Sequence, residues 1–351
     1  GINNWGGGTG SINSGSGDIT LIAKNIAGND ISITTTGKLS LLPDGGSYPA
    51  AITWNGAMSG SDFNASSTFD KLLIKNYSSL GGLTIGYYNG QISGGSPVVQ
   101  TNSSNITVSA AIPVAGPITL YGTALTVNQN LSSSTNKDIS LFGNNLSVGA
   151  SATLSSGGNL IVEPITASTT IGLTGGTGTL AVTATNFNTN FTDGFSEIRI
   201  GNSSAGNITF GSAITAKDNM RFTTSGNLLL NEILTLGNNH LKFVGNTIVP
   251  ASNKYIKTNG IGKLRMDLAN NAGKLFPVGA DYYNPVTITN HIGSTDEFYA
   301  TVSNGVFKDG SNGGTSVTFT PRIDVTWNIG NTTATTGAGN IDLDFGWKAA
   351  N

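Results

Sequence analysis

The chain has 351 residues, of which 49 are glycine and only 10% are charged, and its net charge is −2 at pH 7. Because this balance gives no global field that would attract nucleic acid or an anionic membrane, we expect neither as a partner. No apolar run approaches the length of about 18 residues that a membrane-spanning helix needs, so we expect no membrane span. The absence of cysteine excludes disulfides and cysteine-ligated zinc. Since 37% of the residues are hydrophobic, the chain is expected to bury a core rather than to remain disordered.

The first part of the chain shows a strand-like pattern with one long interruption. Residues 1–16 are rich in glycine, serine and asparagine, and we expect them to form a linker or a cap. The strand-like segments 18–21 and 37–41 follow, and residues 43–70 then break the pattern. This break predicts an inserted loop that projects from one coil and carries candidate ligand contacts at Tyr48, Trp54 and Phe63. Alternatively, these aromatic side chains cover the coil and bind nothing.

Seven apolar triplets follow at a slow, regular spacing. Their first residues are 21, 21, 20, 18, 22 and 21 positions apart, and a fixed period of this size indicates stacked repeats. In each triplet the outer residues are apolar and the middle one varies, which is the alternation of a half-buried strand. The triplets are residues 118–120, 139–141, 160–162, 180–182, 198–200, 220–222 and 241–243.

The segments between the triplets complete the pattern of a parallel β-helix. The main pattern also resumes near 71–74 and runs through 83–85 to 106–108 before it joins the seven triplets. Between the triplets, further strand-like pieces occur at 125–127, 146–148, 208–210 and 228–230. Corners rich in glycine and asparagine separate them, and stacked asparagine side chains there are expected to hydrogen-bond from coil to coil. These observations predict an all-β chain with a right-handed parallel β-helix over residues 17–250.

The composition changes near Pro250. Residues 250–351 hold 11 of the 27 aromatic residues in less than a third of the chain. Longer alternating segments appear at 284–289, 297–302 and 317–320, and they predict antiparallel pairing. We therefore expect residues 251–351 to form an antiparallel β-sandwich-like domain that continues beyond the sequence given.

Two stretches resemble known families. Residues 165–173, 175–180 and 193–201 resemble the repeats of filamentous-haemagglutinin-like surface proteins. Residues 275–279 and 283–290 are similar to a β-module of very large surface proteins in gliding bacteria that use type IX secretion. The resemblance implies export to the cell surface, a right-handed β-helix and adhesin-like or fibre-forming work. The chain is then expected to be part of a longer secreted protein, with any export signal removed or outside it.

Motifs for catalysis or metal binding are scarce in this sequence. Catalysis on a β-helix usually requires carboxylates that converge at a groove, and those of residues 71–250 stand at different phases of the repeat. His240 and His291 are each isolated, and the segment 309–314 lacks a ligand that a calcium loop needs. We expect no catalytic residues, no cofactor and no metal site.

The middle residues of the triplets predict one outward column with a basic end. It runs through Thr119, Ser140, Ile161, Ala181, Arg199, Arg221 and Lys242. One interpretation is a solvated face in which Glu197 or Glu232 pairs with the cations. The other is a docking strip for an acidic glycan at Arg199, Arg221 and Lys242. The change from hydroxyl to aliphatic to basic residues disfavours ice binding, which would call for a regular threonine array.

Three functions compete for this chain. The first is a non-catalytic structural or adhesin module of a cell-surface protein, a stalk that displays binding loops to a glycan or to another surface protein and adjoins further domains of the same polypeptide. The second is a subunit of an extracellular filament or sheath that self-associates through open coil ends. The third is a polysaccharide-processing β-helix enzyme.

Overall fold

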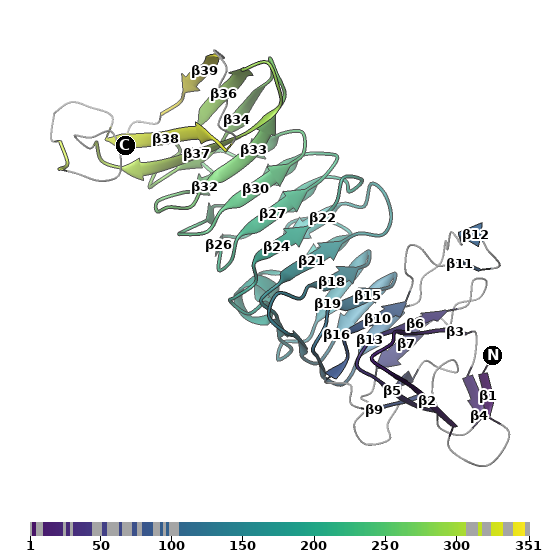
Figure 1. The fold of residues 1–351 in the computed structure, drawn as a ribbon. Coiled ribbons are helices and arrows are strands. Elements are labelled where there is room, and N and C mark those ends of the chain that lie inside the picture. The colour runs from purple at the N-terminus through teal and green to yellow at the C-terminus, as the bar shows by residue number, and fades with distance from the viewer. Residues whose placement is uncertain are drawn as a thin grey trace. The chain divides into compact units, whose positions relative to one another are not determined.

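The computed structural model is built almost entirely of β-strands. It describes residues 2–4, 10–23, 26–28, 31–43, 51–54, 63–64, 72–75, 79–86, 92–93, 96–97, 105–306, 315–317, 324–332 and 340–347. These residues form a parallel β-solenoid of about ten turns, in which strands of successive turns lie side by side (Figure 1). A short helical turn, η2 (Asn186–Asn190), is one departure from this pattern. No described helix is long and apolar enough to cross a membrane.

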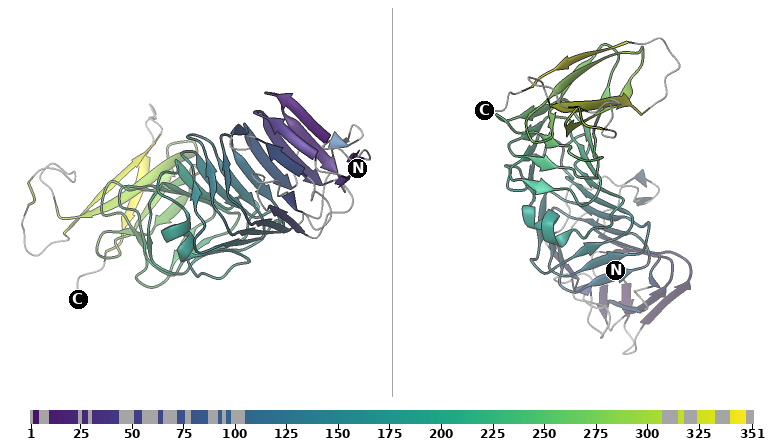
Figure 2. Two further views of the ribbon diagram at one scale, coloured as in Figure 1. Left: turned by 90° about the horizontal axis from the view of Figure 1, so that it is seen from below. Right: turned by 90° about the vertical axis from the view of Figure 1, so that its left-hand side faces the viewer.

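The chain divides into two compact units. The first comprises Gly1–Thr166 and Asn188–Ile198, and the second comprises Ala167–Phe187 and Arg199–Asn351. In both units each full turn contributes strands to three sheets, and Figure 2 shows the stacked turns from two further directions.

The first unit winds through three parallel sheets. Its main sheet has the order β3 (Ile19–Ala23), β6 (Lys38–Pro43), β10 (Gly82–Gly86), β15 (Ile118–Tyr121), β18 (Ile139–Phe142) and β21 (Asn159–Glu163). The second sheet contains β7 (Ala51–Trp54), β13 (Asn105–Val108), β16 (Ala124–Val127) and β19 (Asn145–Val148), with β8 (Phe63–Asn64) antiparallel to β7. The third contains β14 (Ile112–Val114), β17 (Leu131–Ser133) and β20 (Leu154–Ser155).

Smaller sheets lie nearer the N-terminus of this unit. The strands β2 (Gly10–Gly15), β5 (Ile31–Thr35) and β9 (Leu72–Lys75) form one parallel sheet. Two pairs complete the set: β1 (Ile2–Asn4) with β4 (Ile26–Gly28), and β11 (Ile92–Ser93) with β12 (Ser96–Pro97).

The second unit also consists of parallel turns and then changes to antiparallel pairing. Its main sheet contains β27 (Met220–Thr223), β30 (Leu241–Val244) and β33 (Leu264–Leu268), and β24 (Glu197–Ile200) ends in this unit. A second sheet holds β22 (Ile171–Leu173), β23 (Leu180–Val182), β25 (Ile208–Phe210), β28 (Leu228–Leu230) and β31 (Ile248–Pro250). The third holds β26 (Ile214–Thr215), β29 (Leu234–Thr235), β32 (Ile256–Lys257) and β35 (Val278–Gly279).

Antiparallel strands follow the last parallel turn, as expected for the C-terminal region. The strand β37 (Asp296–Asn304) pairs with β33 and with β38 (Val325–Asn331). A separate sheet contains β34 (Gly273–Phe276), β36 (Val286–His291) and β39 (Asn340–Phe345). The expected segments 284–289 and 297–302 thus lie largely in β36 and β37, whereas 318–320 of the third segment lies outside the described residues.

Alternation within each strand builds the core. In β15, β27 and β30 the first and third residues are buried while the second and fourth are partly exposed. Because coils pair in register, each inward side chain lies on its equivalent in the next coil, as Ile118 lies on Ile139 and Leu120 on Leu141. Burial of each large apolar side chain stabilises the fold by roughly 1.5–3 kcal/mol before chain entropy is counted.

Polar side chains at the corners hydrogen-bond to the backbone of the next coil, as the sequence predicted. Asp138 Oδ1 accepts the backbone N–H of Asn159 at 2.8 Å. Asn144 Oδ1 accepts those of Ile165 and Thr166, both at 3.1 Å. These bonds satisfy corner amides that the strand ladders leave unpaired, so the corners contribute to stacking.

Five expectations differ from the structure. Residues 180–182 form β23, which pairs with β22 in the second sheet rather than in the main sheet. Two segments expected on the main pattern also lie in other sheets, 106–108 through β13 and 72–74 through β9, which pairs with β5. Within the expected loop 43–70, residues 51–54 form β7, which pairs in parallel with β13 as part of a coil. Parallel pairing also continues past residue 250, because β32 pairs with β35.

Candidate functional site

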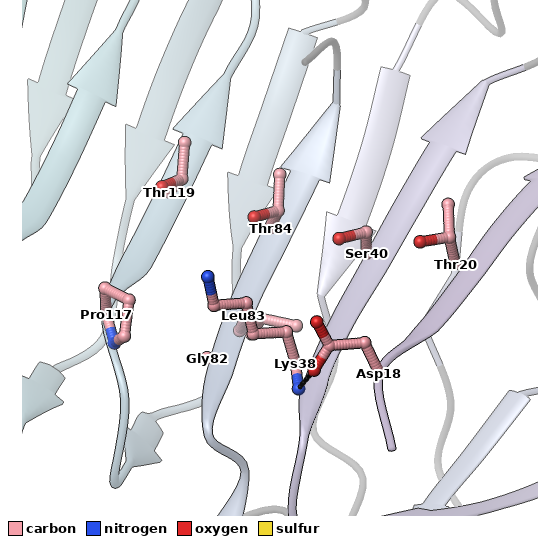
Figure 3. A pocket seen from close by; sticks show the side chains of 9 residues that line it. All are labelled: Asp18, Thr20, Lys38, Ser40, Gly82, Leu83, Thr84, Pro117 and Thr119. Atoms are coloured by element: carbon pink, nitrogen blue, oxygen red, sulfur yellow. Dashed lines mark hydrogen bonds between the residues drawn. The ribbon is translucent and has the colours of Figure 1, made fainter. Parts of the chain in front are cut away.

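A column of hydroxyl groups crosses the outer face of the main sheet in the first unit. Thr20 pairs with Ser40, Ser40 with Thr84, Thr84 with Thr119, and Thr119 with Ser140. Each of these residues stands between two apolar side chains that point inward, so its own side chain points outward. Figure 3 shows the first four hydroxyls in a row across β3, β6, β10 and β15.

The column forms the floor of an open groove with a volume of about 290 Å³. This volume lies near the lower end of the range for small-ligand sites. The lining residues are Asp18, Thr20, Lys38, Ser40, Gly82, Leu83, Thr84, Pro117 and Thr119. The groove is therefore a polar site made by the outer surface of a sheet, with hydroxyl donors and acceptors at each strand.

One edge of the groove carries a carboxylate and an ammonium group. Asp18 Oδ1 accepts the backbone N–H of Lys38 at 2.8 Å, which continues the corner hydrogen bonding described above. The side chain of Lys38 lies over Gly82, where Lys38 Cγ would be 3.2 Å from an added Cβ. In Figure 3 the ammonium points away from Asp18. A side chain at residue 82 would therefore compete with Lys38 for the space beside the column.

Two aromatic residues continue the same face beyond the groove. Tyr121 follows Thr119 by two residues on β15, and Phe142 follows Ser140 by two residues on β18, so all four side chains point to one side. The two rings are half-buried, with centroids 6.0 Å apart. The face thus combines hydrogen-bonding groups with partly exposed aromatic surface, a combination suited to ligands that are both hydroxylated and apolar.

The basic end of the predicted column lies on the main sheet of the second unit, and carboxylates pair with its last cation, Lys242. Arg221 pairs in register with Lys242, and Lys242 with Arg265. Lys242 Nζ lies 2.7 Å from Glu297 Oε2 and 3.0 Å from Asp267 Oδ1. Arg265 lies 3.6 Å from Glu297, and neither Arg199 nor Arg221 is without an interaction of its own.

The acids that pair with Lys242 differ from the two that the sequence suggested. Glu232 pairs with Lys254 at 2.9 Å. Burial alone would lower the pKa of Lys242, but hydrogen bonds to Glu297 and Asp267 more than offset it and raise that pKa. Lys242 therefore stays charged and paired, which supports the interpretation of this column as a solvated face.

The predicted aromatic contacts fall largely outside the described residues. Tyr48 lies outside them, and for Trp54 and Phe63 the description covers only the backbone, where the two residues pair across β7 and β8. The prediction that these side chains contact a ligand stays a prediction. In the described part of the chain, no group of three or more His, Asp or Glu side chains is arranged to hold a metal ion.

His240 occupies a corner of the second unit and gives a pH-dependent prediction. Its Nδ1 accepts the backbone N–H of Lys263 at 3.2 Å, so the neutral imidazole is the form that fits. Burial lowers the pKa of His240 below 6.5, and the charges of Arg265 and Lys263 lower it further. The unfolded chain therefore takes up this proton first as the pH falls, and stability that is fully present above about pH 6.5 is lost below it.

We expect the free energy of unfolding to decrease between pH 7.5 and pH 5, and the variant His240→Asn to lose part of that dependence. Asn can still accept the Lys263 N–H, as Asn219 Oδ1 accepts the N–H of His240 at 2.9 Å. Urea unfolding at several pH values measures the free energy of unfolding of the parent chain and of the variant. Identical pH profiles for the two would contradict the assignment.

The spacing of the triplets placed Thr119 and Ser140, the last two residues of the hydroxyl column, but it did not reveal the groove. Thr20 and Ser40 stand at the same phase of segments 20 residues apart, and that spacing was a usable signal. Alternation placed the segment 83–85 on the main pattern, but Thr84 stands 44 residues after Ser40 and 35 before Thr119, so the period alone does not show that it joins their column. Comparison of the chain with protein-family models, with curated proteins and with solved structures found no match.

Proposed function

We propose that this chain is a non-catalytic module of a larger secreted protein at the cell surface, where the solenoid serves as a stalk that displays binding elements. The observation that carries the proposal is the register of the coils. Inward residues such as Leu39, Leu83 and Ile118 are fully or almost fully buried, and corner side chains hydrogen-bond from coil to coil. Function is therefore left to the outward positions, which vary from hydroxyl to aromatic to charged.

The resemblance of residues 165–201 to filamentous-haemagglutinin-like repeats supports export, and that of residues 275–290 supports type IX secretion. Right-handed winding is part of the proposal, because connections between parallel strands are right-handed in nearly all known cases. We also propose that the antiparallel strands β36 to β39 belong to a β-sandwich-like domain that follows the solenoid.

Surface labelling of intact producing cells tests this role. An antibody raised against the chain is expected to label unlysed cells, and external protease is expected to remove the signal. Deletion of residues 1–351 from the parent protein is expected to reduce attachment of the cells to surfaces. Labelling that appears only after lysis, or unchanged attachment, would contradict the proposal.

The enzymatic alternative is separated by product analysis. The purified chain is incubated with neutral and acidic polysaccharides, and newly formed reducing ends and unsaturated sugars are measured. We expect neither reducing ends nor unsaturated sugars to form above the level of a buffer control. Steady release of either product would favour the polysaccharide-processing enzyme.

Self-association is a second candidate function, and β39 favours it. Among the described strands β39 is the last of its sheet, and Leu343 and Phe345 pair with the buried Ile288 and Val286 of β36. Leu343 and Phe345 are nevertheless 38% and 37% exposed, so an apolar row that continues the core face remains open. Edge strands of this kind pair readily with a second chain.

Light scattering over a range of concentrations tests this second function. Assembly is expected to increase with concentration and to be abolished by Leu343→Lys. A chain that stays monomeric throughout would remove self-association from consideration.

A further inference from the structure

We propose that the outward face of β3, β6, β10, β15 and β18 binds a linear acidic polysaccharide of the polyuronate class, with the chain lying along the hydroxyl column and across the strands. This inference rests on the proposed surface function and names the ligand of that surface. Three features of the face support it: the spacing of the hydroxyl groups, the aromatic surface of Tyr121 and Phe142, and the ammonium group of Lys38.

The spacing of the hydroxyls suits a polymer. Adjacent strands are about 4.8 Å apart, so Thr20, Ser40, Thr84 and Thr119 offer one hydroxyl at each step of that length. An extended polysaccharide presents a hydroxyl-bearing ring at a repeat of similar size. Successive sugar rings can therefore each find a donor and an acceptor, which a single small molecule could not use.

The aromatic pair supplies the apolar half of sugar recognition. A pyranose ring has a face of C–H groups that packs on aromatic surface while its hydroxyls seek polar partners. Tyr121 and Phe142 lie on the side of the sheet that carries Thr119 and Ser140, and both rings keep part of their surface open. The rings stand two residues along the strands from Thr119 and Ser140, so a polymer that lies on the column passes beside them.

Lys38 is the group of this face that can bind a carboxylate, whereas Asp18 on the same edge favours a polymer whose acidic groups lie on the Lys38 side. Its side chain is exposed, and no carboxylate of the described residues forms an ion pair with its ammonium group. The ammonium stands beside the hydroxyl row and points away from Asp18 (Figure 3). A uronate carboxylate placed there completes an ion pair, whereas Lys242 of the basic column already has Glu297 and Asp267 as partners.

The second sheet of the same unit provides a matched control. Thr107 pairs in register with Thr126, and Thr126 with Ser147, so this sheet carries an outward hydroxyl column of the same kind. The other outward residues of β13, β16 and β19 are Asn105, Ala124 and Asn145, none of which is aromatic. If outward hydroxyls served only solubility, the two columns would behave alike.

The test measures binding of the full chain to polygalacturonate by isothermal titration calorimetry, with neutral β-glucan as the comparison. Thr84→Val with Thr119→Val removes two hydroxyls at nearly constant shape and is expected to weaken binding about tenfold. Lys38→Gln is expected to weaken polygalacturonate binding about two- to fivefold and to abolish the preference over β-glucan. The control Thr126→Val with Ser147→Ala is expected to bind as the parent does.

Three results would overturn the inference: no binding of the parent chain to polygalacturonate, equal weakening by the control pair, or equally tight binding of β-glucan. Circular dichroism and thermal unfolding establish that each variant is folded before binding is compared. The proposed surface function can fail independently of this result, because it is tested by labelling and attachment of cells. If the chain is exposed on the cell surface but does not bind polyuronate, the proposed surface function stands and only the proposed ligand is wrong.

Discussion

Replacement of Gly116 by alanine is expected to destabilise the first unit severely, by about 3 kcal/mol or more. A Cβ at this position would lie 1.8 Å from the carbonyl oxygen of Gly81 and 2.0 Å from its carbonyl carbon. These are backbone atoms of the preceding coil, and no side-chain rotation can remove them. The same corner holds Gly37, whose Cβ would lie 2.5 Å from the carbonyl oxygen of Gly17. One glycine at each of these turns thus permits the close approach of successive coils.

Urea unfolding followed by circular dichroism measures this loss. Gly149→Ala serves as the control, because the nearest atom to its added Cβ is at 3.3 Å, so that only a small adjustment is needed. The control is expected to change the free energy of unfolding by less than about 1 kcal/mol. Equal effects of the two substitutions would contradict the stacking of Gly116 on Gly81.

Replacement of Phe243 by alanine is expected to cost about 3–5 kcal/mol, because it opens a cavity in the second unit. Phe243 pairs in register with Phe222, and both side chains are 0% exposed. In a stack of coils each inward residue contacts its equivalents above and below, so the cavity weakens neighbouring interfaces as well. The coils around β27 and β30 are therefore expected to lose hydrogen-exchange protection first.

The matched control is Val249→Ala on β31, whose side chain is 44% exposed. It removes apolar atoms from the surface and is expected to change stability by less than about 0.5 kcal/mol. Urea unfolding gives both values. A loss of less than 1 kcal/mol for Phe243→Ala would show that this residue is not a member of the core.

Short-range alternation made most strands predictable. Six of the seven triplets lie in strands of a main sheet, because apolar residues at alternate positions describe a half-buried strand wherever it pairs. The exception, residues 180–182, has the same local pattern. Its spacing suggested a strand of the main sheet, because Leu180 lies 20 residues after Leu160 and 18 residues before Ile198, and both distances are close to the true period.

The actual path at this exception depends on glycines. After β22 and only a short connection, the chain returns as β23, which pairs in parallel with β22, with Ile171 opposite Leu180. A Cβ on Gly178 would lie 2.1 Å from the amide nitrogen of Gly172, and one on Gly176 would lie 2.0 Å from the carbonyl oxygen of Thr209. The density of glycine between the two strands was the available signal for this tight turn.

The end of the solenoid was placed too early for a related reason. Pro250 ends β31, where it pairs with Leu230, and the change in composition after it reflects longer strands rather than the end of parallel winding. The parallel pairing of β32 with β35 follows. Antiparallel β37 then covers the free edge of β33, and Glu297 on β37 neutralises Lys242 from 55 residues away. Such long-range partners leave no trace in a local pattern.

The groove depends on the pairing of Thr84 with Thr119. An engineered disulfide tests this pairing most directly, because the chain has no cysteine of its own. Register partners on adjacent strands are about 4.8 Å apart, within the distance that a disulfide spans, whereas Thr84 and Ser140 are two strands apart, at roughly 9.6 Å. After mild oxidation, the variant Thr84→Cys with Thr119→Cys is expected to lose both free thiols within one chain. The variant Thr84→Cys with Ser140→Cys is expected to keep them. Free thiols that persist in the first variant, or a bond that forms only in the second, would contradict the register on which the groove is built.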